Sequence, residues 1–445
     1  NIGFSNLFSI QSDFFLGKNF IAMQKADNFT NIPLKIKDFE YFFPTYAYGS
    51  TGKTFDNWGY NLHVGKQGKT IGDTLTGSII FNKTFETDSY TEFSLFSNFL
   101  KYSFDLVHVS SNRMDEFQGD NTDRFMYLHQ YDIRLFKKFK FSVIEGTLVA
   151  NPLQLRYFNP LVFMHQYGGR ADVSTPDSTG KYKDNYDIYR ETNYCAYFAA
   201  MLEFLPVKNT RFYTLFSQVE LQLPYERAQA RGRYYPNSIG VQSGAEYNLY
   251  LKDKSVLNFA AEGVFTSPYL YVKQVPSSSL YRVRTDMQTK QSVYSWIGTP
   301  FGPDCLAGQF KINYKPNKKL ECEFDYVISA KGNNDFDMFN ETYEWTEGDS
   351  KKKAYSYYPS VLYYLIQKGY PETYDELYEQ AIDLSITGIP VITNQFCLKA
   401  SYAITTKLNV NGKFVYTYVV NNNHVKNEKE SGVELALSLQ YKLFD

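Results

Sequence analysis

The chain has 445 residues, with 46 basic and 47 acidic side chains and a formal net charge of −1. This balance excludes the electrostatic attraction on which nucleic-acid-binding proteins depend. Tyrosine (40) and phenylalanine (37) far outnumber tryptophan (3), which indicates a surface that is partly apolar and partly wet. The mean hydropathy of −0.40 and the lack of apolar runs of 18 residues exclude membrane-spanning helices.

The first residue and the cysteines indicate how the chain is processed. It begins at Asn1 rather than at methionine, so we expect a secretory signal that has been removed; a truncated chain would begin in the same way. The four cysteines, Cys195, Cys305, Cys322 and Cys397, have no CxxC spacing. We therefore expect free thiols rather than a zinc or redox motif.

Strand-like alternation is the strongest pattern before residue 330. Between residues 238 and 251, apolar side chains such as Val241 alternate with polar ones such as Gln242. The same pattern covers residues 255–266 and 320–328. Since successive side chains of a strand point to opposite faces, each segment predicts one apolar face and one wet face.

One segment, at about residues 360–385, breaks the alternation. Residues 360–368 (SVLYYLIQK) precede Gly369, a residue type common just past a helix end. Thr373 and Glu376 then have the spacing of a capping box, followed by apolar residues at helical spacing. We predict a short αα-hairpin that plugs the lumen, caps the mouth, or only decorates the surface.

After this insert the alternation returns in residues 408–418 and 433–443. All these runs are about 9–12 residues long, which suits a tilted strand that crosses a bilayer better than a strand of a globular protein. We therefore predict an all-β fold: one transmembrane antiparallel β-barrel domain that spans residues 1–445. A soluble sandwich or propeller is the alternative.

Short and long connections alternate along the chain. Residues 251–254, 315–319 and 405–407 are short, whereas the other connections are long and polar. The long ones are 109–124, 168–192, 225–236, 330–353 and 421–431. This is the pattern of an outer-membrane barrel with long extracellular loops, and the chain length predicts about 16–18 strands.

Motifs for catalysis and metal binding are missing from the sequence. GxSxG, HExxH, P-loop and GxGxxG patterns do not occur, and the five histidines lack the spacing of metal ligands. We interpret the acidic stretches 115–123 and 335–349 as solvated loops, because they lack EF-hand spacing. The sequence thus predicts no enzyme, no cofactor and no metal site.

Carboxylates on the polar faces of the strands predict a charged lumen. Arg156, Arg211 and Lys413 are candidates to pair with them. In an open pore these charges would set ion selectivity, whereas in a blocked barrel they would satisfy one another. The carboxylates are Glu220, Glu246, Glu262, Glu321 and Glu323.

Aromatic and polar residues interleave in three of the long loops. Flat rings suit the C–H faces of sugars, and arginine suits acidic sugars through paired hydrogen bonds. Interfacial anchoring and loop packing are the alternative. The candidate ligand-binding residues are Tyr189, Arg190, Arg231, Arg233, Tyr234, Trp345, Tyr355, Tyr357 and Tyr358.

Three segments resemble the Wzi-type capsule assembly family. They are residues 156–163 (RYFNPLVF), 262–271 (EGVFTSPYLY) and 296–304 (WIGTPFGPD). The family has the corresponding segments in the same order along the chain. The matching motif positions, which we expect to be structural, are Arg156, Asn159, Pro160, Glu262, Gly302, Pro303 and Asp304. The chain differs from the family in lacking an N-terminal helical bundle and in ending with Asp445 after an aromatic residue.

The resemblance implies an outer-membrane barrel of about 18 strands whose lumen is blocked by helical and loop material. It also implies a surface lectin that holds capsular or extracellular polysaccharide. We therefore expect a monomeric, non-catalytic protein of the bacterial outer membrane, with membrane lipid and polysaccharide as partners. The alternatives are a porin-like diffusion channel with an acidic lumen, or a scaffold barrel with protein partners in a larger envelope complex.

Overall fold

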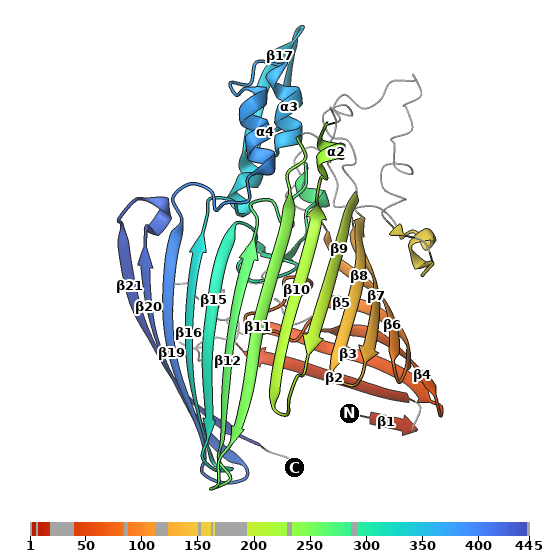
Figure 1. Cartoon of the computed structure of the whole chain (residues 1–445), viewed down its shortest axis with the longest axis vertical. Helices are drawn as coiled ribbons and strands as arrows, with labels where there is room; N and C mark the ends of the chain where they lie inside the picture. Colours follow the sequence, from red (N-terminus) through yellow and green to blue (C-terminus); the bar gives the residue numbers. More distant parts are fainter. Residues whose placement is uncertain are drawn as a thin grey trace.

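The structure, a computed structural model, describes residues 2–5, 8–17, 40–83, 88–111, 123–149, 153–161, 163–164, 194–228, 234–285 and 292–442. In this part, 17 strands form one sheet in which each strand pairs antiparallel with the next (Figure 1). They are β1 (Ile2–Ser5), β2 (Phe8–Gly17), β3 (Glu40–Thr54), β4 (Trp58–Gln67), β5 (Asp88–Ser97), β6 (Leu100–Ser111), β7 (Asp123–Leu135), β8 (Phe139–Val149), β9 (Tyr194–Phe204), β10 (Thr210–Glu220), β11 (Ser238–Tyr250), β12 (Val256–Thr266), β15 (Cys305–Lys315), β16 (Leu320–Lys331), β19 (Val391–Ala403), β20 (Leu408–Val420) and β21 (Lys429–Tyr441).

The predicted strands are confirmed, and their number lies within the expected range. The five alternating segments of the sequence correspond to β11, β12, β16, β20 and β21. All strands of the sheet except β1 have 10–15 residues, which is long enough to cross a bilayer at a tilt. The four cysteines are free thiols, as expected.

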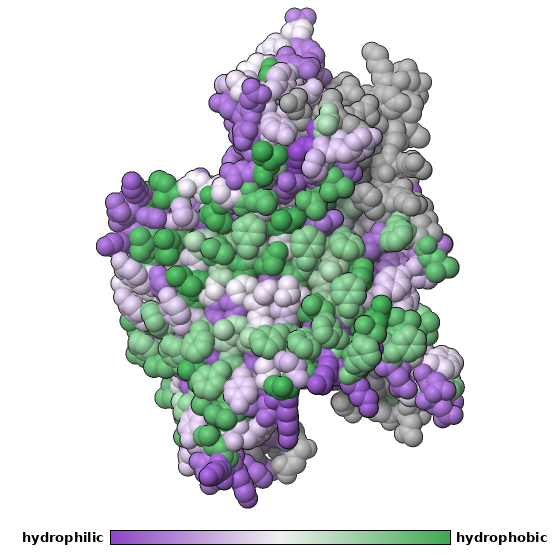
Figure 2. All heavy atoms as spheres, in the orientation of Figure 1, coloured by the Kyte–Doolittle hydropathy of each residue, from purple (hydrophilic) through white to green (hydrophobic). Residues whose placement is uncertain are grey.

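The two faces of the sheet differ as the alternation requires. On β11, Val241 is 38% exposed on the outer face, whereas Gln242 is fully buried on the inner face. Figure 2 shows a broad apolar belt across the outer face, with hydrophilic residues at both ends. We call the 17-stranded sheet the wall. A wall of this kind belongs to a β-barrel of the bacterial outer membrane, because lipid covers so wide an apolar belt.

Helices play a small part in the described residues. None of them is long and apolar enough to cross a membrane. The helices are α2 (Pro224–Ala228), α3 (Pro359–Ile366) and α4 (Tyr374–Ile382), with 3-10 turns at Leu155–Phe158, Pro276–Ser278, Phe336–Asn340 and Asn422–His424.

Short and long connections alternate around the sheet, as predicted. The short ones have two to five residues and the long ones have eight to 59 residues. Short connections mark the periplasmic end of a bacterial barrel and long ones its extracellular end. The described short turns are 55–57, 98–99, 136–138, 205–209, 251–255, 316–319 and 404–407.

The edges of the sheet are β1 and β21, which are not paired with each other among the described residues. The sheet has an odd number of antiparallel strands, so its two edge strands run in the same direction, which is towards the end with the short turns. Closure of the barrel is therefore not seen in the described part. Every residue of β21 is exposed on both faces.

Two long connections contain hairpins that the sequence analysis missed. Residues 267–304 include β13 (Tyr281–Thr285) and β14 (Ser292–Trp296), and residues 332–390 include β17 (Thr342–Glu347) and β18 (Ser350–Tyr355). The segment that we predicted as a long polar loop, 330–353, thus contains most of the second hairpin. Each hairpin is too short to show a convincing alternation in the sequence.

The αα-hairpin is confirmed. In α4, the Thr373 hydroxyl accepts from the Glu376 N–H at 3.3 Å, and the Glu376 carboxylate accepts from the Thr373 N–H at 2.8 Å. Gly369 has a φ of +94° just past the end of α3, a conformation that glycine favours. Together with β17, the helices project beyond the strand ends that carry the long connections (Figure 1), so they do not plug the lumen between the strands. We call residues 332–390 the cap.

Candidate functional site

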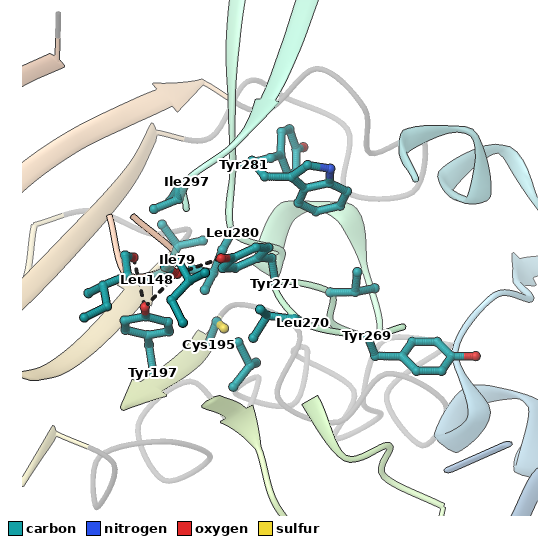
Figure 3. Packing of buried hydrophobic residues seen from close by; sticks show 14 of the residues in the cluster. Ile79, Leu148, Cys195, Tyr197, Tyr269, Leu270, Tyr271, Leu280, Tyr281 and Ile297 are labelled. Carbon is teal, nitrogen blue, oxygen red and sulfur yellow. Dashed lines mark hydrogen bonds between the residues drawn. The ribbon is translucent and has the colours of Figure 1, made fainter. Parts of the chain in front are cut away.

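The connection between β4 and β5 folds against the inner face of the wall. Its residues Ile79, Ile80 and Phe81 are fully buried. Figure 3 shows Tyr197 of β9 and Tyr271 pointing at Ile79. The Tyr271 hydroxyl donates to the Ile79 carbonyl at 2.6 Å, and the Tyr197 hydroxyl donates to the Ile80 carbonyl at 2.9 Å. Wall side chains therefore hold this loop by its backbone.

Glu262 of β12 is the main anchor of that loop. Its buried carboxylate accepts from the backbone N–H groups of Leu75 at 2.8 Å and Thr76 at 2.9 Å. It also accepts from the Thr76 hydroxyl, from the Gln242 amide at 2.9 Å and from the Tyr213 hydroxyl at 2.5 Å. A buried charge is tolerated when it is hydrogen-bonded to this extent.

Gln242 and Arg211 add two further attachments. The Gln242 side chain accepts from the Ile79 N–H and donates to the Gly77 carbonyl, both at 3.0 Å. Arg211 donates to the carboxylates of Glu203 at 2.9 Å and Glu246 at 3.0 Å. Its guanidinium also donates to the carbonyl of Asp73 at 2.7 Å. The predicted pairing of Arg211 with lumen carboxylates is confirmed.

The connection between β12 and β15 also folds against this inner face. Every residue from 266 to 282 is buried. The Arg124 guanidinium of β7 donates to the Ser279 carbonyl and lies 4.2 Å from the centre of the Tyr281 ring. The Lys273 ammonium donates to Glu220 of β10 at 2.9 Å. We call residues 68–83, 267–285 and 292–304 the plug.

The segment that resembles the capsule assembly family joins the plug to the cap. Asp304 is fully buried, and its carboxylate accepts from the N–H groups of Asn334 at 2.9 Å and Thr387 at 3.0 Å. The Thr387 hydroxyl also donates to it. Gly302 has a φ of +69°, and a Cβ there would lie 2.5 Å from the Trp296 ring. The Pro303 carbonyl accepts from Lys331 at 2.5 Å.

These positions therefore support structure, as the resemblance implies. The other matching segment, near residue 156, is not part of the plug. Asn159 accepts from the Leu161 N–H at 3.0 Å, and the Pro160 carbonyl accepts from the Tyr131 hydroxyl. The Arg156 guanidinium lies 4.9 Å from the centre of the Tyr157 ring. Arg156, which we predicted as a lumen charge, lies in a 3-10 turn of the β8–β9 connection and not on a strand.

Among the described residues, no connection covers the inner face of β16, β19, β20 and β21 in this way. Glu323 pairs with Lys311 and Lys399, both at 2.6 Å, and Glu321 pairs with Lys315 at 3.0 Å. Lys413, which we expected to pair with a carboxylate of the set, instead pairs with Glu434 at 2.9 Å. Residues of β16, β19, β20 and β21 line a cavity of about 360 Å³. A second cavity, of about 800 Å³, opens between β3 and β7 near the short turns.

Eight of the nine predicted sugar-binding residues fall into three groups. Tyr355, Tyr357 and Tyr358 are buried, and the Tyr357 hydroxyl donates to the Lys273 carbonyl at 2.9 Å. They pack the base of the cap and present no face to solvent. Trp345 is half-buried against the Tyr343 ring. Tyr189, Arg190, Arg231 and Arg233 lie outside the described residues.

Tyr234 belongs to a cluster that the sequence analysis did not assemble. It stacks on Tyr363 of α3 at 4.5 Å between ring centres, and Tyr374 of α4 lies 5.2 Å from Tyr363. Tyr234 is buried, Tyr363 is half-buried, and Tyr374 is 39% exposed. This tyrosine cluster joins the β10–β11 connection to the cap, and Tyr374 is its most exposed member.

The resemblance implies a blocked lumen, but sequence reasoning did not identify the loops that form the plug. The apolar run of Ile79, Ile80 and Phe81 was a usable signal, because three large apolar residues in a long connection must find cover. The polar contacts of Glu262 and Gln242 with the plug had no such signal, since the plug residues that they bind lie more than 160 residues away in the chain. No group of three His, Cys, Asp or Glu residues in the described part could hold a metal ion.

Comparisons with known proteins find only low similarity. No family model matches the chain, and no curated protein matches its sequence. Among solved structures, it is similar to Wzi of Escherichia coli, a carbohydrate-binding β-barrel involved in group 1 capsule assembly, at 10% identity and a TM-score of 0.45; the match covers 90% of this chain and 70% of Wzi.

Two porin-like structures are similar to a comparable degree. The anion-selective porin of Comamonas acidovorans matches at 10% identity and a TM-score of 0.38, over 98% of both chains. The outer-membrane channel DcaP of Acinetobacter baumannii matches at 9% identity and a TM-score of 0.37, over 98% of this chain and 94% of DcaP. The chain is thus an outer-membrane β-barrel protein by its own strand pattern and apolar belt, with both binding proteins and channels among its structural relatives.

Proposed function

We propose that this protein is a non-catalytic outer-membrane barrel that holds polysaccharide at the cell surface through its cap. The observation that carries this proposal is the tyrosine cluster of Tyr234, Tyr363 and Tyr374, which lies at the extracellular end. Stacked rings at fixed distances are a rigid platform, and a sugar that binds to them loses little freedom beyond its own. The plug supports the proposal, because it occupies space that a wide channel would need.

The charge of the cap narrows the class of sugar. Residues 332–390 contain eleven carboxylates and four lysines, a net charge of −7. An acidic polymer would be repelled by this charge, whereas a neutral polymer would not. We therefore propose that the cap holds a neutral polysaccharide in preference to an acidic one.

Retention of purified protein on immobilised bacterial surface polysaccharides, neutral and acidic, tests the proposal. We expect Tyr374→Ala to weaken binding to a retained neutral polymer by about tenfold, since it removes an exposed stacking face. Tyr374→Phe keeps the ring and is the matched control, so it should retain most of the affinity. Absence of retention on every polymer, or equal retention by the alanine variant, would contradict the proposal.

A diffusion channel is the second candidate, and the uncovered inner face of β16–β21 favours it. Carboxylates such as Glu321 and Glu323 line that side, although lysines pair with them. Uptake of a small neutral sugar into vesicles that contain the protein distinguishes the candidates. Rapid uptake together with no polysaccharide retention would support the channel.

A further inference from the structure

The short turns carry a concentrated positive charge. The seven described turns contain eight lysines and two aspartates, a net charge of +6 in a chain whose total is −1. The lysines are Lys137, Lys138, Lys208, Lys252, Lys254, Lys318, Lys319 and Lys407, which we call the lysine arc. Figure 2 shows the hydrophilic lower end of the molecule where several of these turns lie.

The arc is continuous along the wall. Its lysines lie in five successive turns, from the one between β7 and β8 to the one between β19 and β20. These turns join ten neighbouring strands of the sheet, so at about 4.8 Å per strand the arc spans roughly 45 Å. The turns at 55–57 and 98–99, on the other part of the rim, contain no lysine.

The lysines of the arc are not consumed by ion pairs. Apart from Lys407, none of them has a carboxylate partner among the described residues, and all seven are exposed. Lys138 donates only to the Pro206 carbonyl, at 3.1 Å. Asp253, one of the two turn aspartates, accepts from the Ser255 N–H and hydroxyl instead. These seven lysines therefore present free ammonium groups.

Large apolar side chains accompany the lysines in the same turns. Phe136 is 90% exposed beside Lys137, and Val207 is 65% exposed beside Lys208. Leu251 and Ile404 are likewise exposed in their turns. An apolar group next to an ammonium suits the boundary of a lipid leaflet, where the first enters the acyl region and the second meets a headgroup.

We propose that the lysine arc binds the phosphate headgroups of anionic phospholipids in the periplasmic leaflet. The extent of the arc along ten strands, the free ammonium groups of seven of its lysines and its apolar neighbours all match a row of lipid headgroups along the wall. An acidic polymer of the cell wall would match the charge but would leave Phe136 and Val207 without apolar cover. This surface lies at the opposite end from the cap and is independent of the proposed polysaccharide binding.

Lipid retention by native mass spectrometry tests the proposal. Purified protein in a neutral detergent is mixed with equal amounts of phosphatidylglycerol and phosphatidylethanolamine. We expect phosphatidylglycerol to be enriched at least about fivefold, which corresponds to one strong lysine–headgroup contact. The enrichment should fall in 0.5 M salt.

Variants with matched controls locate the binding. Replacing the seven unpaired lysines with glutamine should remove the enrichment, whereas Lys351→Gln, Lys352→Gln and Lys353→Gln on β18 should leave it unchanged. Far-UV circular dichroism checks that both variants fold, and a variant set limited to Lys318→Gln and Lys319→Gln gives a partial loss if the full set does not fold.

Three results would overturn the proposal. They are equal retention of both lipids by the natural protein, enrichment that survives in the arc variants, and equal loss in the β18 control. Glycerol phosphate is a soluble competitor that has the headgroup phosphate but no acyl chains. It should not displace phosphatidylglycerol, because the lipid also contacts the apolar side chains of the turns. Displacement would assign the arc to free phosphate instead. Preferential binding to purified peptidoglycan sacculi, lost in the arc variants, would assign the arc to a cell-wall polymer instead.

Discussion

In the part of the chain that the structure describes, one side of the inner face of the wall is covered by the plug and the other side is not. From β6 to β12 the plug buries the inward side chains, and polar residues such as Glu262 and Gln242 bond to its backbone. From β16 to β21 the inward side chains are partly exposed and pair with neighbours on adjacent strands, as Glu323 does with Lys399. The same residue types thus hold a loop on one side and only balance charge on the other.

This difference shows that burial determines how much a polar contact contributes to the stability of the fold. A buried carboxylate that loses its donors, or buried donors that lose their acceptor, incur the full cost of desolvation. An ion pair in water gains little, because both ions are already well solvated. The two sides should therefore respond very differently to similar substitutions.

Glu262→Ala is expected to have the largest effect. It removes the acceptor of two plug N–H groups and of the Tyr213 hydroxyl, all within a buried site. We expect it to lower the free energy of unfolding by about 3–5 kcal/mol, measured by urea titration in lipid vesicles. Proteolysis should also cut within residues 68–83. A loss below about 1 kcal/mol would show that the plug does not depend on this anchor.

Asp304→Ala should loosen the cap without releasing the β4–β5 loop. It removes the acceptor of the Asn334 and Thr387 N–H groups and places alanine at a φ of +57°. We expect a loss of about 2–3 kcal/mol and faster proteolysis within residues 332–390. Asp304→Asn, which tolerates this conformation and keeps one acceptor oxygen, is the control and should lose less. An intact cap in both variants would contradict this assignment.

Thr373→Ala should cost about 1 kcal/mol in the stability of α4, because it removes the helix cap. The Thr373 N–H and hydroxyl also lower the pKa of Glu376 through hydrogen bonds to its carboxylate. A lowered pKa means that this contribution is present above the ordinary carboxylate pKa and is lost as the pH falls through the lowered value. Hydrogen exchange of α4 at pH 7 and at pH 3 measures both effects. Equal protection of the variant and the natural protein at pH 7 would contradict the prediction.

Glu434→Gln should have the smallest effect. Its partner Lys413 and Glu434 itself have side chains that are 40% and 51% exposed. We expect a change in the free energy of unfolding below about 1 kcal/mol, in the same urea titration as for Glu262→Ala. A large loss here would show that the β16–β21 side is covered after all.

The wall could be predicted from the sequence because its cause is local. In a strand that faces lipid on one side, apolar and polar side chains must alternate along the chain. A short stretch of residues was therefore enough to predict each of β11, β12, β16, β20 and β21. The αα-hairpin was visible for the same reason, through Thr373, Glu376 and Gly369. The alternation of short and long connections completed the architecture.

The plug and the tyrosine cluster could not be predicted, because their contacts join distant parts of the chain. Tyr234 and Tyr363 meet only after the β10–β11 connection reaches α3. Tyr357 and Tyr358 looked like exposed loop aromatics, since a run of tyrosines in a polar segment has no period that indicates burial. The sequence analysis therefore proposed tyrosines that are buried, and it did not bring Tyr363 and Tyr374 together with Tyr234.

The central claim is that the plug occupies the lumen and leaves no wide path through the barrel. Conductance across a planar bilayer tests it most directly, with the natural protein compared with a variant that lacks residues 72–78. The account predicts no steady current for the natural protein and a steady ohmic current for the variant. A steady ohmic current through the natural protein, unchanged by the deletion, would contradict it.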